Sequence, residues 1–165
     1  MENIILQKEY YQPLGNHNKK AELVKTSSIE NLIKFPFTHF NPPQSESLEH
    51  FNKDCNIVVS APTASGKTVI IELWIIKTLL KNGKSLYLSP MKALTEEKYE
   101  DWTNPNHTFS KYKISIITGD FILSKEKLEE LNDADIIVAT AEMLDSKTRN
   151  FGKYQWLQDI KLVVS

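Results

Sequence analysis

A Gly-Lys-Thr loop lies between a strand-like segment and a helix-like segment, and this order constrains the fold more than any other feature of the chain. Residues 56–60 form a short β-branched run, residues 61–68 read Ala-Pro-Thr-Ala-Ser-Gly-Lys-Thr, and residues 69–76 are mostly apolar. A loop in this position brings several backbone N–H groups to the positive end of a helix, where they bind phosphate. Gly-Lys-Thr alone arises by chance in a lysine-rich chain, but the flanking strand and helix favour phosphate binding.

The side chains of this loop predict a nucleotide site with a divalent cation. Lys67 adds a mobile positive charge for the β- and γ-phosphates, and Thr68 offers a hydroxyl to Mg²⁺. Both are therefore candidate catalytic residues, and Thr68 is the candidate metal ligand. The candidate nucleotide-binding residues of the loop are Pro62, Thr63, Ala64, Ser65, Gly66, Lys67 and Thr68.

Alanine occupies two positions of the loop where glycine is common. Because alanine resists positive φ, we expect Ala61 and Ala64 to adopt ordinary backbone angles while Gly66 approaches the phosphate.

From residue 56 onward, short apolar runs alternate with helical patterns. This alternation is typical of βαβ units whose parallel sheet is buried on both faces. The expected fold class is therefore α/β, a parallel-sheet P-loop NTPase domain. The predicted strands are 56–60, 85–89, 114–118, 136–140 and 162–164, and the predicted helices are 45–51, 66–81, 92–102, 124–131 and 142–149.

The first 35 residues lack this alternation and are broken by Pro13, Gly15 and a polar stretch at 16–20. They are consistent with a small strand pair, an arm over the main domain or a disordered leader. We expect residues 1–35 to form an N-terminal extension and residues 36–165 to form one domain, since the chain of 165 residues with 41% hydrophobic content supports a single core.

Charge and cysteine content exclude several classes of function. The net charge is −1, so contact with nucleic acid must be local or made through the backbone. A single cysteine, Cys55, and four scattered histidines exclude a disulfide framework and a zinc cluster. No stretch resembles a signal peptide or a membrane span, so we expect an intracellular protein, in the cytoplasm or the nucleus or nucleoid, with no membrane partner.

Gln44 is a candidate for base recognition. Pro42 and Pro43 stiffen the backbone before it, and its amide offers the donor and acceptor that match the N6/N7 edge of adenine. The alternative is that Pro-Pro-Gln is an ordinary helix entry.

Short turns follow three of the predicted strands, at the sheet edge where ligands bind in α/β folds. Small side chains after residue 89 let a nucleic-acid backbone approach main-chain amides, with Lys92 near phosphate. Gly119 and Thr140 follow the next two strands. Ser89 as an N-cap with Pro90 at the first helical position explains the first turn equally well. The turns at residues 118–120 and 140–142, each taken alone, are more typical of an ordinary turn and helix cap.

Together these stretches resemble superfamily 2 DExH helicases, in the branch of the archaeal lesion-processing, spliceosomal and exosome-assisting helicases. Residues 40–44 resemble the Q motif, 61–68 motif I, 89–98 motif Ia, 118–120 motif Ib and 139–149 motif Ic. The resemblance implies an incomplete first RecA-like domain that binds ATP with Mg²⁺. It also implies contact with single-stranded or partly duplex DNA or RNA through Pro90, Met91, Lys92, Ala93, Thr118, Gly119, Asp120, Thr140, Glu142 and Arg149.

In this family an Asp-Glu-x-His motif follows the strand that residues 161–165 resemble, and the 165 residues do not contain it. We therefore expect a longer helicase chain with a second RecA-like domain as partner, and little hydrolysis by these residues alone. The alternative is a stand-alone, non-hydrolysing nucleotide and nucleic-acid binding module. A GTPase or phosphotransferase is disfavoured because no Asn-Lys-x-Asp stretch occurs.

Overall fold

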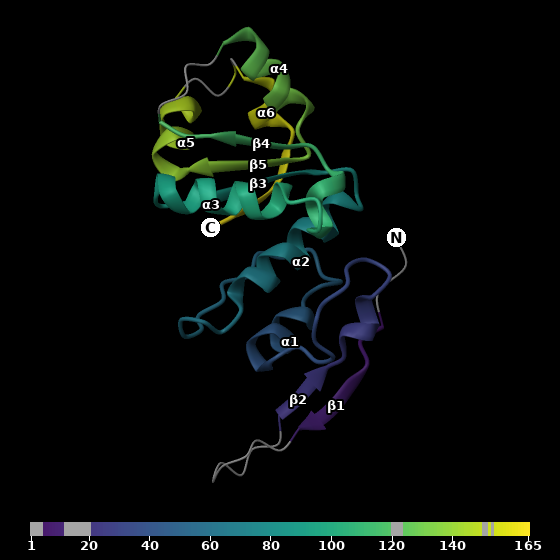
Figure 1. Cartoon of the computed structure of the whole chain (residues 1–165). Coiled ribbons are helices and arrows are strands. Elements are labelled where there is room, and N and C mark those ends of the chain that lie inside the picture. Colours follow the sequence, from purple (N-terminus) through teal and green to yellow (C-terminus); the bar gives the residue numbers. More distant parts are fainter. Residues whose placement is uncertain (1–4, 12–20, 120–123, 150–151, 153) are drawn as a thin grey trace. The chain divides into compact units, whose positions relative to one another are not determined.

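The computed structural model describes residues 5–11, 21–119, 124–149, 152 and 154–165. The chain divides into two compact units, one ending at Lys77 and the other beginning at Thr78, and each is described by itself. Figure 1 shows the elements of both. No helix in the described part of the chain is long and apolar enough to cross a bilayer.

The first unit contains an antiparallel strand pair, β1 (Lys8–Tyr11) and β2 (Ala21–Val24). The strand pair is one of the three alternatives that the sequence left open for residues 1–35. A 3₁₀ turn η1 (Thr26–Ile29), helix α1 (Pro42–Leu48) and most of helix α2 (Lys67–Leu79) complete the unit.

Hydrogen bonds and ring contacts connect these elements. The Val24 N–H donates to Ser45 Oγ at 3.0 Å, and this hydroxyl donates to the Phe40 carbonyl at 2.9 Å. Strand β2 is thereby joined to the start of α1. The rings of Phe51 and Trp74 meet edge to face at 5.4 Å, which joins the segment after α1 to α2.

The second unit is a parallel α/β layer structure. Its strands are β3 (Lys84–Ser89), β4 (Ile114–Ile117), β5 (Ile136–Thr140) and β6 (Ile160–Val164), and their order in the sheet is β4-β5-β3-β6. All three pairings are parallel. The helices are α3 (Lys92–Thr103), the 3₁₀ turn η2 (Thr108–Lys111), α4 (Lys125–Asp133), α5 (Ala141–Thr148) and α6 (Gln155–Gln158).

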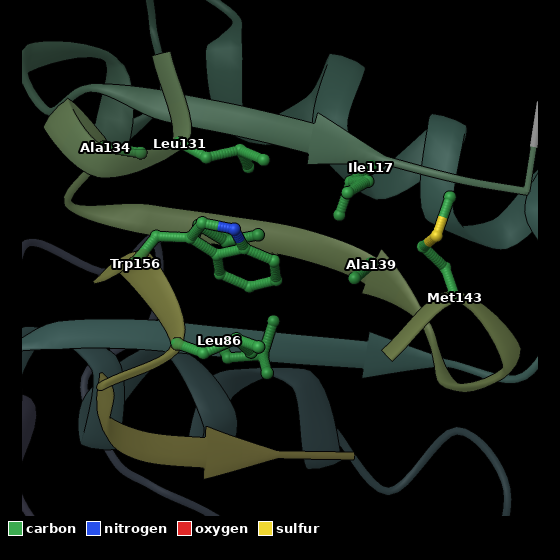
Figure 2. Close-up of a cluster of buried hydrophobic side chains, with 9 residues drawn as sticks. Leu86, Ile117, Leu131, Ala134, Ala139, Met143 and Trp156 are labelled. Atoms are coloured by element: carbon green, nitrogen blue, oxygen red, sulfur yellow. The ribbon is translucent and has the colours of Figure 1, made fainter. Parts of the chain in front are cut away.

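Both faces of this sheet are covered, as predicted for a parallel sheet. On one face Trp156 of α6 lies over the middle of the sheet between Leu86 and Ile117 (Figure 2), within an apolar cluster that α4 and α5 also supply. On the other face Trp102 of α3 meets Tyr87 of β3 edge to face at 5.2 Å. The side chains of adjacent residues 86 and 87 thus pack on opposite faces of the sheet, as the two-residue repeat of a strand requires.

One predicted strand is wrong. Residues 56–60 carry no strand, and Val58 is 98% exposed. A strand needs a neighbour to accept and donate its ladder hydrogen bonds. In the described part of the first unit the only sheet is the β1–β2 pair, and this segment does not join it.

The other predicted elements occur with small changes at their ends. Helix α1 begins at Pro42 instead of residue 45, because Asn41 caps it and two prolines fit its first turn. Strand β6 begins two residues early, at Ile160.

Candidate functional site

A reverse turn shapes the loop at residues 61–66. The Ser65 N–H donates to the Pro62 carbonyl at 3.3 Å, and Ala64 has a φ of 61°. The expectation of an ordinary angle is therefore wrong for Ala64, although Ala61 is not among the residues with positive φ. Position 64 is the third residue of this turn, where a left-handed angle reverses the chain direction. The turn thus imposes on an alanine a conformation that costs about 1–2 kcal/mol.

Gly66 is required at its position for two reasons. Its φ is 73°, and a Cβ atom added there would lie 2.4 Å from the Nε2 atom of Gln44. The first condition strains any L side chain, and the second demands that Gln44 move. The backbone at this position therefore needs a glycine, while the approach of Gly66 to phosphate stays a prediction.

Lys67 and Thr68 are the first residues of α2, and both are exposed. The Lys67 ammonium donates to the carbonyls of Ala61 at 2.9 Å and Pro62 at 2.7 Å. The charge of the lysine is therefore held against the start of the loop. Phosphate oxygens are stronger acceptors than neutral carbonyls, so a phosphate group can displace these bonds.

The remaining loop side chains differ in exposure. Pro62, Thr63 and Ala64 are exposed. The Ser65 hydroxyl oxygen is shielded from solvent and has no hydrogen-bond partner among the described residues. Within the described residues the loop is therefore held by side-chain donors on its carbonyls and by the Ser65–Pro62 backbone bond, and not by the Ser65 hydroxyl.

Gln44 is buried, with 4% of its surface exposed, and its amide has two partners. The Oε1 atom accepts from the Asn41 N–H at 3.0 Å, and the Nε2 atom donates to the Gly66 carbonyl at 3.1 Å. The Gln44 N–H in turn donates to Asn41 Oδ1 at 3.1 Å, which completes a capping box. The helix-entry alternative is therefore present in the structure, together with a contact to the phosphate loop.

The turns that carry the candidate residues after β3, β4 and β5 lie at one edge of the sheet in the second unit. Ser89 at the end of β3 is in register with Thr140 at the end of β5, and Ile117 at the end of β4 is in register with Ala139. The arrows of β4 and β5 in Figure 1 point the same way. The turns that follow these strands therefore emerge side by side, as predicted from their order in the sequence. Asp120 lies outside the described residues.

The turn after β3 differs from the capping alternative. Helix α3 begins at Lys92, and Met91 occupies the N-cap position without a side-chain cap. Ser89 is thus not the cap, and Pro90 is not the first helical residue. The Met91 carbonyl accepts from the Thr95 N–H at 3.0 Å and from Thr95 Oγ1 at 2.9 Å. Met91 itself is 59% exposed, and Ala93 is also exposed.

Caps and ion pairs occupy several other candidates at this edge. Thr140 caps α5 by accepting from the Met143 N–H at 3.4 Å, and Glu142 lies in the first turn of that helix. Arg149 donates to the Asp145 carboxylate at 2.8 Å, and Lys92 lies 3.9 Å from that of Glu96. All of these ionic partners are exposed and therefore exchangeable.

Two candidates after β4 are distinguished by burial. The Thr118 side chain is buried, and its Oγ1 atom has no partner among the described residues. Gly119 is exposed, and a Cβ atom there would meet no atom of the described residues within 4 Å. A backbone or ligand can therefore approach Gly119 closely.

The sequence did not single out Asn41 as a site residue. Its Nδ2 atom donates to the Ser65 carbonyl at 2.8 Å. The spacing of Asn41 and Gln44 is a capping-box signature that indicates a helix start. That signature carries no information about a contact with the loop, which is more than twenty residues away in the chain.

Comparisons with known proteins give a consistent family. The sequence profile of the DEAD/DEAH box helicases matches residues 41–165. The chain is 32% identical over 168 residues to the U5 small nuclear ribonucleoprotein 200 kDa helicase of Mus musculus, covering 98% of this chain and 8% of that protein. It is 40% identical over 140 residues to the ATP-dependent DNA helicase Hel308 of Pyrococcus horikoshii, covering 82% of this chain and 18% of that protein.

A comparison with solved structures also finds a helicase. The crystal structure of a hypothetical ATP-dependent RNA helicase from Sulfolobus tokodaii matches with a TM-score of 0.59 and 26% identity, covering 84% of this chain and 40% of that one. The chain therefore spans less than half the length of each of these proteins.

Proposed function

Because the chain belongs to the DEAD/DEAH box helicase family, we propose that it is the ATP-binding part of an ATP-dependent helicase or translocase that acts on nucleic acid. The observation that carries this proposal is the loop at residues 61–68. A left-handed Gly66, the Lys67 ammonium on the loop carbonyls and Thr68 in the first turn of α2 form a phosphate cradle. The names of the relatives, which include ATP-dependent helicases, support the choice of ATP.

In the proposed complex the loop contributes backbone hydrogen-bond donors, the ammonium group of Lys67 and the hydroxyl group of Thr68. The backbone N–H groups of residues 63, 64, 66 and 67 bind phosphate oxygens, and the exposed Lys67 ammonium leaves its carbonyls to pair with the β- and γ-phosphates. The Thr68 hydroxyl fits an oxygen-binding cation such as Mg²⁺, which neutralises phosphate charge when it is bound.

We place nucleic acid at the strand ends of the second unit. The exposed turns there offer backbone amides, an open Gly119 and the cations of Lys92 and Arg149. Such contacts reach the sugar-phosphate backbone and do not select a base sequence. The substrate class is therefore single-stranded or partly duplex DNA or RNA, and relatives of both kinds are named.

Hydrolysis needs groups that residues 1–165 do not supply in this proposal. The family motif with the catalytic Asp and Glu does not occur in the sequence, and arginine fingers come from a second RecA-like domain. We expect the 165-residue chain to bind ATP and to hydrolyse almost none by itself.

Replacement of Lys67 by alanine tests the nucleotide site. In the wild-type chain ATP with Mg²⁺ should raise the melting temperature, and in K67A most of this shift should disappear while the melting temperature without nucleotide stays the same, because Lys67 is exposed and outside the core. Differential scanning fluorimetry over a range of ATP concentrations measures both quantities. The matched control is K34A, which removes an exposed lysine of the same unit and should keep the full shift. Equal shifts in the wild type and K67A would refute the phosphate site.

A further inference from the structure

We propose that Asn41 is a positioning residue that sets the path of the phosphate loop, acting both directly and through Gln44. This inference rests on the proposed ATP-binding function of residues 61–68. It assigns to Gln44 a second role besides base recognition, as a clamp on the loop backbone.

Two side chains at the start of α1 hold two consecutive carbonyls of the loop. Asn41 Nδ2 donates to the Ser65 carbonyl at 2.8 Å, and Gln44 Nε2 donates to the Gly66 carbonyl at 3.1 Å. The Gly66 carbonyl also accepts from the Val69 N–H at 3.1 Å, in the first turn of α2. The loop is thus joined to α1 and to α2 at the same peptide groups.

Each clamping side chain accepts a hydrogen bond from the backbone N–H of the other residue. The Asn41 N–H donates to Gln44 Oε1 at 3.0 Å, and the Gln44 N–H donates to Asn41 Oδ1 at 3.1 Å. Every polar atom of the Asn41 side chain is therefore engaged, and the Gln44 amide is fixed at its oxygen. With Gln44 only 4% exposed, the amide has little freedom to turn away from Gly66.

Because the peptide group is planar, fixing the direction of a carbonyl also fixes the direction of the N–H group in the same peptide unit. In a trans peptide the C=O and the N–H of the same unit point in opposite directions, and the part of the chain that the structure describes, which includes the loop, has no cis peptide bond. Holding the carbonyls of Ser65 and Gly66 toward α1 therefore turns the N–H groups of Gly66 and Lys67 away from it. These are donors that a phosphate-binding loop presents to its ligand.

The glycine at position 66 belongs to the same arrangement. A Cβ atom there would come within 2.4 Å of Gln44 Nε2, so the absence of a side chain lets the Gln44 amide approach the loop, whereas Asn41 Nδ2 would lie at an ordinary contact distance of 3.5 Å. The Gln44 amide still has one N–H and one lone pair unused by these contacts. It is therefore chemically able to contact a base while it holds the loop.

The competing explanation is that Asn41 is only a helix cap. Replacing Asn41 by aspartate distinguishes the role of a helix cap from the role of a loop contact. Aspartate is as good an N-cap as asparagine but has no donor for the Ser65 carbonyl. The variant N41D keeps the cap of α1 and places a carboxylate oxygen against a carbonyl oxygen.

The test compares N41D with the wild-type chain in two measurements. Hydrogen exchange without nucleotide should show faster exchange of the amides at residues 63–67 and unchanged exchange in α1. The dissociation constant for ATP with Mg²⁺, from isothermal titration calorimetry, should rise about tenfold, the equivalent of one lost hydrogen bond. The dissociation constant for GTP should rise by the same factor, because the loop holds phosphates and not the base.

S124A is the matched control. It removes the N-cap of α4 in the second unit, where Ser124 accepts from the Lys127 N–H at 3.2 Å, and should leave ATP affinity unchanged. If N41D shows wild-type loop exchange or wild-type ATP affinity, Asn41 is only a cap and the inference is wrong. If the wild-type chain binds no ATP, the proposed function is wrong, and the exchange measurement alone decides whether Asn41 holds the loop.

Discussion

Two residues of the phosphate loop (residues 61–68) adopt left-handed backbone angles, and the steric cost of that angle differs between the two residues. Gly66 has a φ of 73° and pays no steric cost, whereas Ala64 has a φ of 61° with a Cβ atom in place. Ala61 has no such angle. The two alanines of one loop should therefore respond in opposite ways to the same substitution.

Replacing Ala64 by glycine should stabilise the chain by about 0.5–1 kcal/mol, since the relief of the left-handed angle exceeds the added entropy of the unfolded chain. Urea unfolding measures the change. The control A61G removes the same methyl group at an ordinary angle and should destabilise by roughly 0.5–1 kcal/mol. A loss of stability in both variants would mean that position 64 is not strained.

At the scale of elements, one buried lysine connects a strand to the end of a helix. Lys84 begins β3, and its ammonium donates to the carbonyls of Leu131 at 2.7 Å and Asn132 at 2.8 Å, in the last turn of α4. A cation there satisfies terminal carbonyls and opposes the helix dipole. Burial lowers the pKa of Lys84, against the opposing effect of Asp159, Asp135 and Asp133.

The variant K84M should destabilise the second unit by about 1–3 kcal/mol, because it keeps the aliphatic stem but leaves the buried Leu131 carbonyl and the partly buried Asn132 carbonyl without this donor. Urea unfolding followed by circular dichroism measures this loss. Lys161 on β6 is exposed and has no ion pair or hydrogen bond among the described residues, so K161M should change stability by less than about 0.5 kcal/mol. Similar effects of the two substitutions would contradict a capping role for Lys84.

Ion pairs hold the N-terminal strand pair, and they give it a dependence on pH. Lys8 pairs with Glu22 at 3.2 Å and Glu49 at 2.8 Å, while Glu9 contacts Lys25 and lies 3.0 Å from His39. The hydrogen bonds from Lys25 and then His39 lower the pKa of Glu9, and the hydrogen bond from Lys8 lowers the pKa of Glu49.

A carboxyl group whose pKa is lowered by folding stabilises the protein above its unfolded pKa, here 4.5, and loses that contribution as the pH falls through its folded pKa. The double variant E9Q/E49Q should therefore have a lower urea midpoint than the wild type at pH 7, and the difference should vanish as the pH falls well below 4.5. Glu30 is exposed and has no ionic partner among the described residues, so E30Q should follow the wild-type curve. A difference that persists unchanged at low pH would exclude these pairs as its cause.

At the scale of the whole molecule, the net charge of −1 limits how nucleic acid can be held. No general basic field is available, and only Lys92 and Arg149 among the candidate contact residues carry positive charge. Binding should therefore depend on few ionic contacts and on backbone amides at the strand ends.

We expect the logarithm of the association constant for a single-stranded oligonucleotide to fall with the logarithm of salt concentration with a slope of roughly −1 to −2, as for two phosphate contacts. Fluorescence anisotropy over a series of NaCl concentrations gives this slope. The double variant K92A/R149A should bring it close to zero. A slope steeper than about −4 would place the binding surface elsewhere.

Local sequence patterns were sufficient to predict most elements of the second unit and the position of the loop at residues 61–68. Strand β5 and helix α3 were predicted to within a residue at each end, because a run of buried apolar residues and a helical repeat are local properties. The need for glycine at position 66 was also visible, since the spacing of Gly66, Lys67 and Thr68 is itself the signature of the loop.

Backbone conformations and contacts that depend on residues distant in the chain became known only from the folded structure. The apolar run at 56–60 is not a strand, because strand formation requires a neighbouring backbone that no local pattern specifies. The angle of Ala64 follows from the turn that the loop makes, and the clamp of Asn41 and Gln44 follows from contacts across 22 and 24 residues. These hydrogen bonds form because α1 packs against the loop, and neither the residues of α1 nor those of the loop predict that packing by themselves.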